Sequence, residues 1–136
     1  MIYVIGIGPG SRNLMTEEAI KAIEDSEVIV GYKTYINLIT EFIGDKEVVQ
    51  NGMRKEVDRC QEAIEIAKTG KKVAVISSGD SGIYGMAGLI LELVTKQGVD
   101  IPVKVVPGVT ASIGAAAVLG APIMHDFCHI SLSDLM

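Results

Sequence analysis

The sequence has few cysteines and no cluster of basic residues, and both absences limit what the protein can be. Only Cys60 and Cys128 occur among 136 residues, which is too few for a disulfide framework and favours a reducing, cytoplasmic location. The formal net charge is -5 at pH 7, and no basic run occurs. Nucleic acid is therefore not an expected partner, because its phosphates require a basic surface.

The sequence also lacks signals for secretion or membrane insertion. The segment MIYVIGIGPG at the start has no basic region and reaches its glycines too early for a signal peptide. Residues 105–124 carry no charge, but prolines and glycines interrupt them and alanine dominates their middle. We expect a buried helix with flanking turns there, and no membrane partner. Hydrophobic residues make up 49% of the chain, which predicts a packed globular domain.

The fingerprints of the common nucleotide-binding sites are incomplete. GIGPG at 6–10 follows the first predicted strand, but Ser11 stands where G-x-G-x-x-G requires its last glycine. Gly31 stands where a ribose-binding acid would end the second strand, which also argues against the common Rossmann-type methyltransferases. No G-K-[ST] motif occurs. By itself, GIGPG is equally compatible with a simple tight turn.

Apolar runs alternate with helical patterns along the chain. Strands are predicted at 2–7, 28–30, 47–50, 72–76 and 103–106, and helices at 16–25, 36–43, 55–69, 83–96 and 110–119. A sixth strand is expected to begin within DFCHISLSDLM. This alternation predicts an α/β fold with a mostly parallel five- or six-stranded sheet and helices on both faces.

Three glycine-rich loops follow three of the predicted strands, namely GIGPG, SSGDSGIYG at 77–85 and PGVTAS at 107–112. The carboxyl ends of parallel strands meet at one edge of a sheet, so these loops are expected to converge on a ligand. Glycines allow a ligand to approach the backbone closely. Asp80 can accept hydrogen bonds from a ribose or an ammonium group, and Thr110 can cap the last helix and also contact a ligand.

Six segments together resemble the tetrapyrrole (corrin/porphyrin) methylase family. They are GIGPG, GYKTY (31–35), NGMRKEV (51–57), SSGDSGIYGMA (77–87), PGVTA (107–111) and GAPIMHDFCHISLSD (120–134). They span essentially the whole chain in the family's order. Within the family, GYKTY, GM-x-x-E and HDF-x-x-ISLSD are similar to the members that act at C-17 of the macrocycle in cobalamin biosynthesis.

The resemblance implies an S-adenosylmethionine-dependent methyltransferase that methylates C-17 of a precorrin or cobalt-precorrin and contracts the ring. It implies a cytoplasmic homodimer of two-domain chains, with residues 1–136 as the N-terminal domain and the second domain absent from this chain. By motif matching, the cofactor would contact Pro9, Gly79, Asp80, Ile83, Thr110 and Ala111, and the substrate Gly8, Gly10, Tyr32, Tyr35 and Met53. Ser81 replaces the proline of the family's Gly-Asp-Pro, which loosens the turn but keeps the acid.

Several residues allow two interpretations. Ring contraction needs proton transfers, for which His125 and Asp126 are candidates, or they are polar residues that finish a turn. His125, Cys128 and His129 are close in sequence, but no second cluster completes four ligands, so no metal site is expected. Tyr32 and Tyr35 contact the macrocycle or pack half-buried on the sheet. Arg54, Lys55 and Arg59 attract the acidic side chains of a tetrapyrrole or form the solvated face of a helix.

Two other functions stay open on the sequence alone. One is a methyltransferase of the same fold that acts on uroporphyrinogen, diphthine or ribosomal RNA. The other is a non-catalytic binding or dimerisation module that retains the fold without the second domain.

Overall fold

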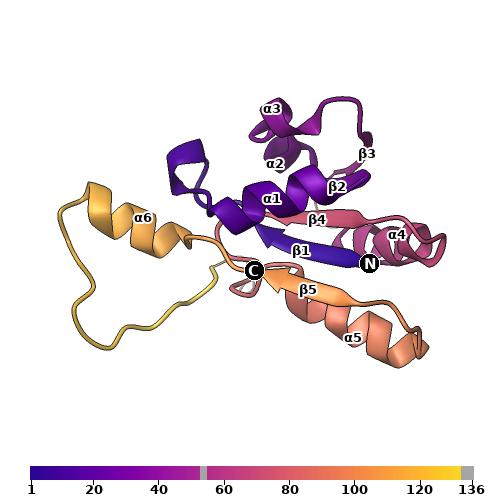
Figure 1. Ribbon diagram of the computed structural model, residues 1–136. Helices are drawn as coiled ribbons and strands as arrows, with labels where there is room; N and C mark the ends of the chain where they lie inside the picture. The colour runs from indigo at the N-terminus through magenta and orange to yellow at the C-terminus, as the bar shows by residue number, and fades with distance from the viewer. Residues whose placement is uncertain (53–54, 133–136) are drawn as a thin grey trace.

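One parallel sheet organises the chain in the computed structural model, which describes residues 1–52 and 55–132 (Figure 1). Its strands are β1 (Ile2–Gly6), β2 (Val28–Tyr32), β3 (Glu47–Asn51), β4 (Val73–Ser77) and β5 (Val103–Val106). They lie in the order β3-β2-β4-β1-β5, and every neighbouring pair is parallel. The predicted α/β class and five-stranded parallel sheet are confirmed.

The helices follow the predicted order with two differences. They are the short η1 (Arg12–Leu14) and then α1 (Glu17–Asp25), α2 (Lys33–Asn37), α3 (Thr40–Ile43), α4 (Glu56–Lys68), α5 (Ala87–Gln97) and α6 (Ala111–Val118). The single helix predicted at 36–43 is two short helices. The helix predicted from Ile83 begins at Ala87, because the backbone N–H of Ala87 donates to the carbonyl of Ser81 and closes the preceding residues into a loop.

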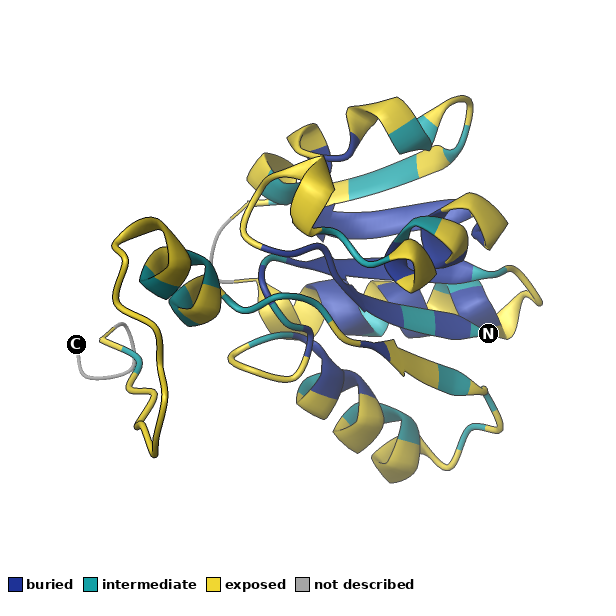
Figure 2. Ribbon diagram, turned by 60° about the vertical axis from the view of Figure 1, so that its left-hand side comes forward, coloured by how far each residue is buried: buried dark blue, intermediate teal, exposed yellow. Residues whose placement is uncertain are grey.

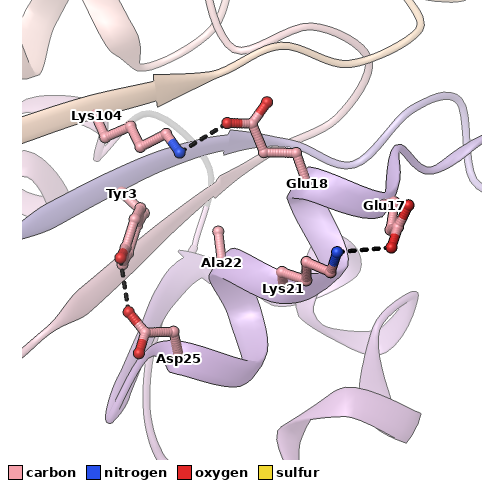
Figure 3. A pocket seen from close by; sticks show the side chains of 7 residues that line it. All are labelled: Tyr3, Glu17, Glu18, Lys21, Ala22, Asp25 and Lys104. Atoms are coloured by element: carbon pink, nitrogen blue, oxygen red, sulfur yellow. Dashed lines mark hydrogen bonds and ion pairs between the residues drawn. The ribbon is translucent and has the colours of Figure 1, made fainter.

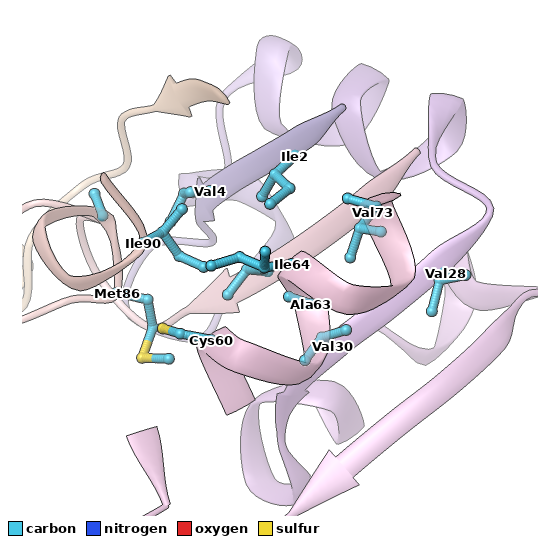
Figure 4. Close-up of a cluster of buried hydrophobic side chains, with 13 residues drawn as sticks. Ile2, Val4, Val28, Val30, Cys60, Ala63, Ile64, Val73, Met86 and Ile90 are labelled. Atoms are coloured by element: carbon cyan, nitrogen blue, oxygen red, sulfur yellow. The ribbon is translucent and has the colours of Figure 1, made fainter. Parts of the chain in front are cut away.

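Helices cover both faces of the sheet, as the sequence predicted. On one face α4 and α5 pack against the β-branched side chains of the central strands, with Ile64 and Ile90 fully buried (Figure 4). On the other face α1, α2 and α3 pack against a second cluster, in which Ile23 and Ile29 are fully buried. Alternate residues of each strand supply the two clusters, since successive side chains point to opposite faces.

Helix α4 buries a different set of residues from the one its pattern suggested. Ala63, Ile64 and Ala67 are buried as predicted, but Val57 is exposed and Arg59 is buried in its stead. The interpretation of Arg59 as part of a solvated face is therefore wrong. Cys60 is also buried, and desolvation raises the pKa of its thiol to about 12, so it stays protonated and unreactive at neutral pH.

Helix α6 lies outside this packing. It extends away from the sheet beyond the strand ends, and none of its residues is buried (Figures 1 and 2). The prediction of a buried helix at 110–119 is therefore wrong for this chain. Its alanine-rich sequence meets no second layer among the described residues. No helix in residues 1–52 and 55–132 is both long and apolar enough to cross a bilayer.

The expected sixth strand is also missing from the described residues. Residues 121–130 are exposed and form no strand, and β5 pairs with β1 alone in the part of the chain that the structure describes. The segment instead turns back toward the loop after β4, where the hydroxyl of Tyr84 accepts a hydrogen bond from the backbone N–H of Ser131 at 3.1 Å. This contact replaces the sheet pairing that the pattern suggested.

Candidate functional site

The three glycine-rich loops meet at the carboxyl edge of the sheet. The loops after β1 and β4 lead to α1 and α5, which cover opposite faces. From β1 the chain continues to β2 on one side of the sheet, and from the neighbouring β4 it continues to β5 on the other side. Open α/β sheets bind their ligands outside the strand ends at such a point. The loop that follows β5 leads into α6 and completes the cluster.

Hydrogen bonds tie the three loops into one unit. Gly8 and Gly79 form an antiparallel bridge, with N–H···O distances of 3.0 and 2.8 Å. One carboxylate oxygen of Asp80 accepts from the backbone N–H of Gly108 and the other from that of Gly82, both at 2.9 Å. Asp80 therefore organises the loops through the backbone.

Ser81, the departure from the family's proline, is buried and takes over part of this linkage. Its hydroxyl donates to the carbonyl of Val106 at 3.0 Å, which joins the loop after β4 to the end of β5. A buried hydroxyl that has a partner carries little desolvation cost. The replacement thus keeps the turn fixed by a hydrogen bond where a proline ring would restrict it.

Two glycines are required by how closely the loops approach one another. A Cβ atom on Gly108 would lie 2.7 Å from the carbonyl oxygen of Gly6 and would also collide with that of Gly79. Gly8 has φ +74, and a Cβ there would lie 2.7 Å from the carbonyl oxygen of Leu14. A side chain on Gly108 would push the loops apart, and one on Gly8 would displace the backbone of Leu14 within the loop after β1, since real Cβ contacts do not come so close.

An open hollow of about 370 Å³ lies over these loops. All six residues predicted to contact the cofactor line it: Pro9, Gly79, Asp80, Ile83, Thr110 and Ala111. Thr110 occupies the N-cap position of α6, but its side chain makes no capping hydrogen bond. The expected capping role is therefore wrong, and the Thr110 hydroxyl remains available to a ligand.

The residues predicted to contact the substrate are distributed differently. Tyr35 lines the hollow, and its ring meets that of Tyr32 edge to face with centroids 5.2 Å apart. Gly8 lies in the bridge to Gly79, and Gly10 is exposed beside it. Met53 lies outside the described residues. Tyr32 is half-buried and does not line the hollow, which agrees with its packing role.

Three further residues line the hollow, namely Ser78, Tyr84 and His129; the sequence had singled out His129 only as a possible metal ligand, and Ser78 and Tyr84 not individually. Tyr84 has the unusual φ of +51, and its hydroxyl donates to the carbonyl of His129 at 3.1 Å. The two rings also meet edge to face at 5.8 Å. Ser78 and Tyr84 lie inside the quoted motif SSGDSGIYG, so the motif was a usable signal for them, whereas no local pattern indicated that His129 lies beside Tyr84.

The candidate acid and base are not in the hollow. His125 and Asp126 are exposed in the segment after α6 and do not line it. A catalytic role for either stays a prediction that the described geometry does not support. Among the described residues, no group of three or more His, Cys, Asp and Glu side chains is placed to hold a metal ion.

A second hollow, of about 500 Å³, lies between α1, β1 and β5 on the flank of the sheet (Figure 3). Its charges are already paired: Lys104 with Glu18, and Lys21 with Glu17, each at 2.7 Å. Such exposed ion pairs form the ordinary surface of an α/β protein. The hollow over the glycine-rich loops is the better candidate for a ligand-binding site, because its lining presents backbone and hydroxyl groups to a ligand.

Comparison with known proteins agrees with this geometry. The family model described as Tetrapyrrole (Corrin/Porphyrin) Methylases matches residues 1–135, and the chain belongs to this family. Within it, the chain is 63% identical over 136 residues to a protein of Salmonella typhimurium named "Probable cobalt-factor III C(17)-methyltransferase". The match covers 100% of this chain and 56% of that relative.

Two solved structures extend the comparison. The crystal structure of the methyltransferase CobJ superposes with a TM-score of 0.90 at 38% identity, covering 98% of this chain and 56% of that one. The uroporphyrin-III C-methyltransferase of Thermus thermophilus, complexed with S-adenosylhomocysteine, gives a TM-score of 0.73 at 25% identity and covers 92% and 53%. The chain thus spans about half the length of these relatives.

Proposed function

We propose that this chain is the N-terminal domain of an S-adenosylmethionine-dependent methyltransferase that methylates C-17 of a cobalt-containing precorrin and contracts its ring, in cobalamin biosynthesis. The observation that carries the proposal is the convergence of all six predicted cofactor residues on one hollow. The high identity to a C(17)-methyltransferase that is named for cobalt-factor III supports the position and the metallated substrate.

The lining of the hollow fits a nucleoside thioether. Gly79 lies close to Thr110 and Ala111, because a Cβ placed on it would already be in van der Waals contact, 3.5 Å from the backbone nitrogen of Ala111. Pro9 and Ile83 add apolar surface, and the free Thr110 hydroxyl adds a hydrogen-bonding group. The relative that was solved with S-adenosylhomocysteine has the same fold, which supports this choice of cofactor.

The chain's own residues would act by positioning. The bound cofactor supplies a methyl group on a sulfonium, which is already activated for displacement, so a protein nucleophile is not needed. The Asp80 contacts to Gly82 and Gly108 fix the loops before the ligand arrives, which reduces the ordering cost of binding. Tyr35 lies on the lining where a macrocycle could stack against it.

The proposal extends to how the domain is completed. Exposed apolar residues of α6 and the segment after it, such as Val118 and Leu119, suit contact with a second domain or a second copy of the chain. The chain's share of its relatives, about half, supports a further domain in the complete protein. A cytoplasmic homodimer remains part of the proposal, and sedimentation of the complete protein would measure its oligomeric state.

Methyl transfer can be tested in a chimera. Residues 1–136 would replace the matching part of the Salmonella typhimurium relative, whose remaining sequence supplies the rest of the enzyme. We expect methyl transfer from S-adenosylmethionine to cobalt-factor III, detected as a mass increase of the macrocycle. A folded chimera that methylates uroporphyrinogen and leaves cobalt-factor III unchanged would contradict the proposed substrate.

Cofactor binding has its own test on the chain alone. Calorimetric titration with S-adenosylhomocysteine measures whether the hollow binds without the remaining part of the enzyme. A chimera that transfers methyl groups while the chain alone binds nothing would show that the three loops form only half of the cofactor site. A chimera that binds S-adenosylhomocysteine but methylates neither macrocycle would favour the non-catalytic alternative.

A further inference from the structure

Arg59 is a buried cation next to the candidate site. It projects from the first turns of α4 and is only 4% exposed. One amino group of the guanidinium donates to the carbonyl of Gly52 at 3.0 Å. Its Nε is buried and has no hydrogen-bond partner among the described residues. An arginine stays charged at all ordinary pH values, so an unpartnered donor of this kind carries a desolvation cost.

Arg59 lines a small cavity that adjoins the cofactor hollow. The cavity has a volume of about 90 Å³ and shares Tyr35, Ser78 and Tyr84 with the larger hollow. Its lining therefore combines a guanidinium with four residues that carry hydroxyl groups, namely Tyr35, Ser77, Ser78 and Tyr84. An exposed acid, Glu56, also belongs to the lining, but no ion pair joins it to Arg59 within 4.0 Å among the described residues.

We propose that Arg59 binds a carboxylate of a ligand that occupies the adjoining hollow. The planar guanidinium presents its donors in a fork that matches the two oxygens of a carboxylate, and Nε is one of those donors. This inference rests on the proposed function, which brings two sources of a carboxylate to this place. One is a carboxylate side chain of the tetrapyrrole, and the other is the amino-acid end of the cofactor.

The position of the cavity fits either source. It lies on the side of the larger hollow bounded by Tyr35 and Tyr84, and its volume of about 90 Å³ is too small for a whole nucleoside or a whole macrocycle. A carboxylate reaching in from either ligand would pair the buried charge and leave the rest of the ligand in the larger hollow. Arg59 would then select ligands that carry a carboxylate at the correct distance from the reacting centre.

Three probes distinguish the two sources. S-adenosylhomocysteine carries the amino-acid carboxylate, 5′-methylthioadenosine is the related nucleoside thioether without it, and uroporphyrin is a stable macrocycle with carboxylate side chains. Each would be titrated by calorimetry into the wild-type chain and into Arg59→Gln, which replaces the guanidinium with a shorter, uncharged amide. Lys68→Gln, an exposed charge at the other end of α4, is the matched control.

The expected result is a loss of affinity of about 10-fold or more in Arg59→Gln, as for a charge-assisted hydrogen bond, with Lys68→Gln unchanged. A loss confined to S-adenosylhomocysteine, with 5′-methylthioadenosine unaffected, assigns Arg59 to the cofactor carboxylate. A loss confined to uroporphyrin assigns it to the macrocycle. Arg59→Lys should recover part of the affinity, because it restores the charge without the fork.

The proposal is overturned if Arg59→Gln binds all three probes as the wild type does while unfolding at the same urea concentration. If the wild-type chain alone binds none of them, the same titrations are made in the chimera, where equal affinity of Arg59→Gln and the wild type for all three probes overturns the proposal. Neither result contradicts methyl transfer, which the chimera reports separately. If Arg59→Gln fails to fold, Arg59→Lys is compared in its place, and affinity for every probe equal to that of the wild type overturns the proposal.

Discussion

Helices α4 and α6 have opposite relations between composition and burial. Helix α4 is rich in charged residues, yet it buries Arg59, Cys60, Ala63, Ile64 and Ala67 against the sheet. Helix α6 has no charged residue, and none of its residues is buried as a whole. The difference shows that burial depends on the layer that the fold offers to a helix, because apolar residues become buried only where a partner surface exists.

The largest expected effect contrasts one isoleucine from each helix. Ile64→Ala should lower the free energy of unfolding by about 2–5 kcal/mol, since it opens a cavity in the packed cluster of α4 and α5. Ile113→Ala on α6, where the side chain is 44% exposed, should change it by less than about 0.5 kcal/mol. Urea titration followed by circular dichroism measures both. Equal losses would show that α6 packs in solution as firmly as α4.

The next effect concerns Asp80, which links the loop after β4 to the loop that leads into α6. Asp80→Ala removes the acceptor for the N–H groups of Gly82 and Gly108 and should cost about 1.5–3 kcal/mol. It should also abolish binding of S-adenosylhomocysteine, because the loops lose their fixed spacing. Asp100→Ala, at an exposed acid outside the site, is the control. Unchanged cofactor affinity in Asp80→Ala would remove Asp80 from the site.

A smaller effect compares the two N-cap threonines. The hydroxyl of Thr16 accepts from the backbone N–H of Ala19 at 3.0 Å, so Thr16→Ala should cost about 1 kcal/mol in urea titration. Thr110→Ala should cost clearly less, because that side chain makes no capping bond. Its effect should appear as weaker binding of S-adenosylhomocysteine. A larger stability loss at Thr110 than at Thr16 would contradict the geometry of α6.

The smallest effect is electrostatic and concerns Asp25, the last residue of α1. Hydrogen bonds from Lys72 and then from Tyr3 lower the pKa of Asp25 (Figure 3 shows the Tyr3 contact). Because the folded pKa is depressed, this contribution to stability is present above the unfolded pKa, near 4, and is lost as the pH falls through the folded value. Asp25→Asn should lower the urea midpoint slightly at pH 7.

The matching acid measurement checks the sign of that effect. As the pH falls through the folded pKa of Asp25, the wild type and Asp25→Asn should converge, since the carboxyl group then becomes protonated in the folded state as well as in the unfolded state. Lys72→Gln should also make the stability depend less on pH in the acid range, because it removes the hydrogen bond that lowers the pKa of Asp25 most. A difference between wild type and Asp25→Asn that grows on acidification would contradict the depressed pKa.

The sheet was predictable because its strands are short β-branched runs that leave few alternatives. Residues 28–30 and 72–76, for example, lie within or next to β2 and β4 as expected, and Thr16 with Glu17 marked the start of α1. The convergence of the three loops followed from parallel pairing alone. Local pattern and topology agree here, so the sequence was sufficient to predict the sheet and the meeting of the three loops.

The remaining features depend on contacts between distant residues. The apolar pattern of α6 is the same whether or not a second layer covers the helix, so the exposure of α6 could not be predicted from the sequence. Arg59 looks like any helix-surface cation until Gly52 is found beside it. The position of His129 depends on Tyr84, a residue 45 positions away, through hydrogen bonds that no local periodicity encodes.

The place of β1 in the sheet has a consequence for how the chain folds. β1 lies between β4 and β5, so both of its partners lie beyond residue 72 in sequence, whereas β2 and β3 are neighbours in both sequence and space. During synthesis β1 is made well before either strand that it pairs with. Pairing of strands that lie so far apart in sequence slows folding, and a chain truncated before β4 would leave β1 without either of the partners that it has in the sheet.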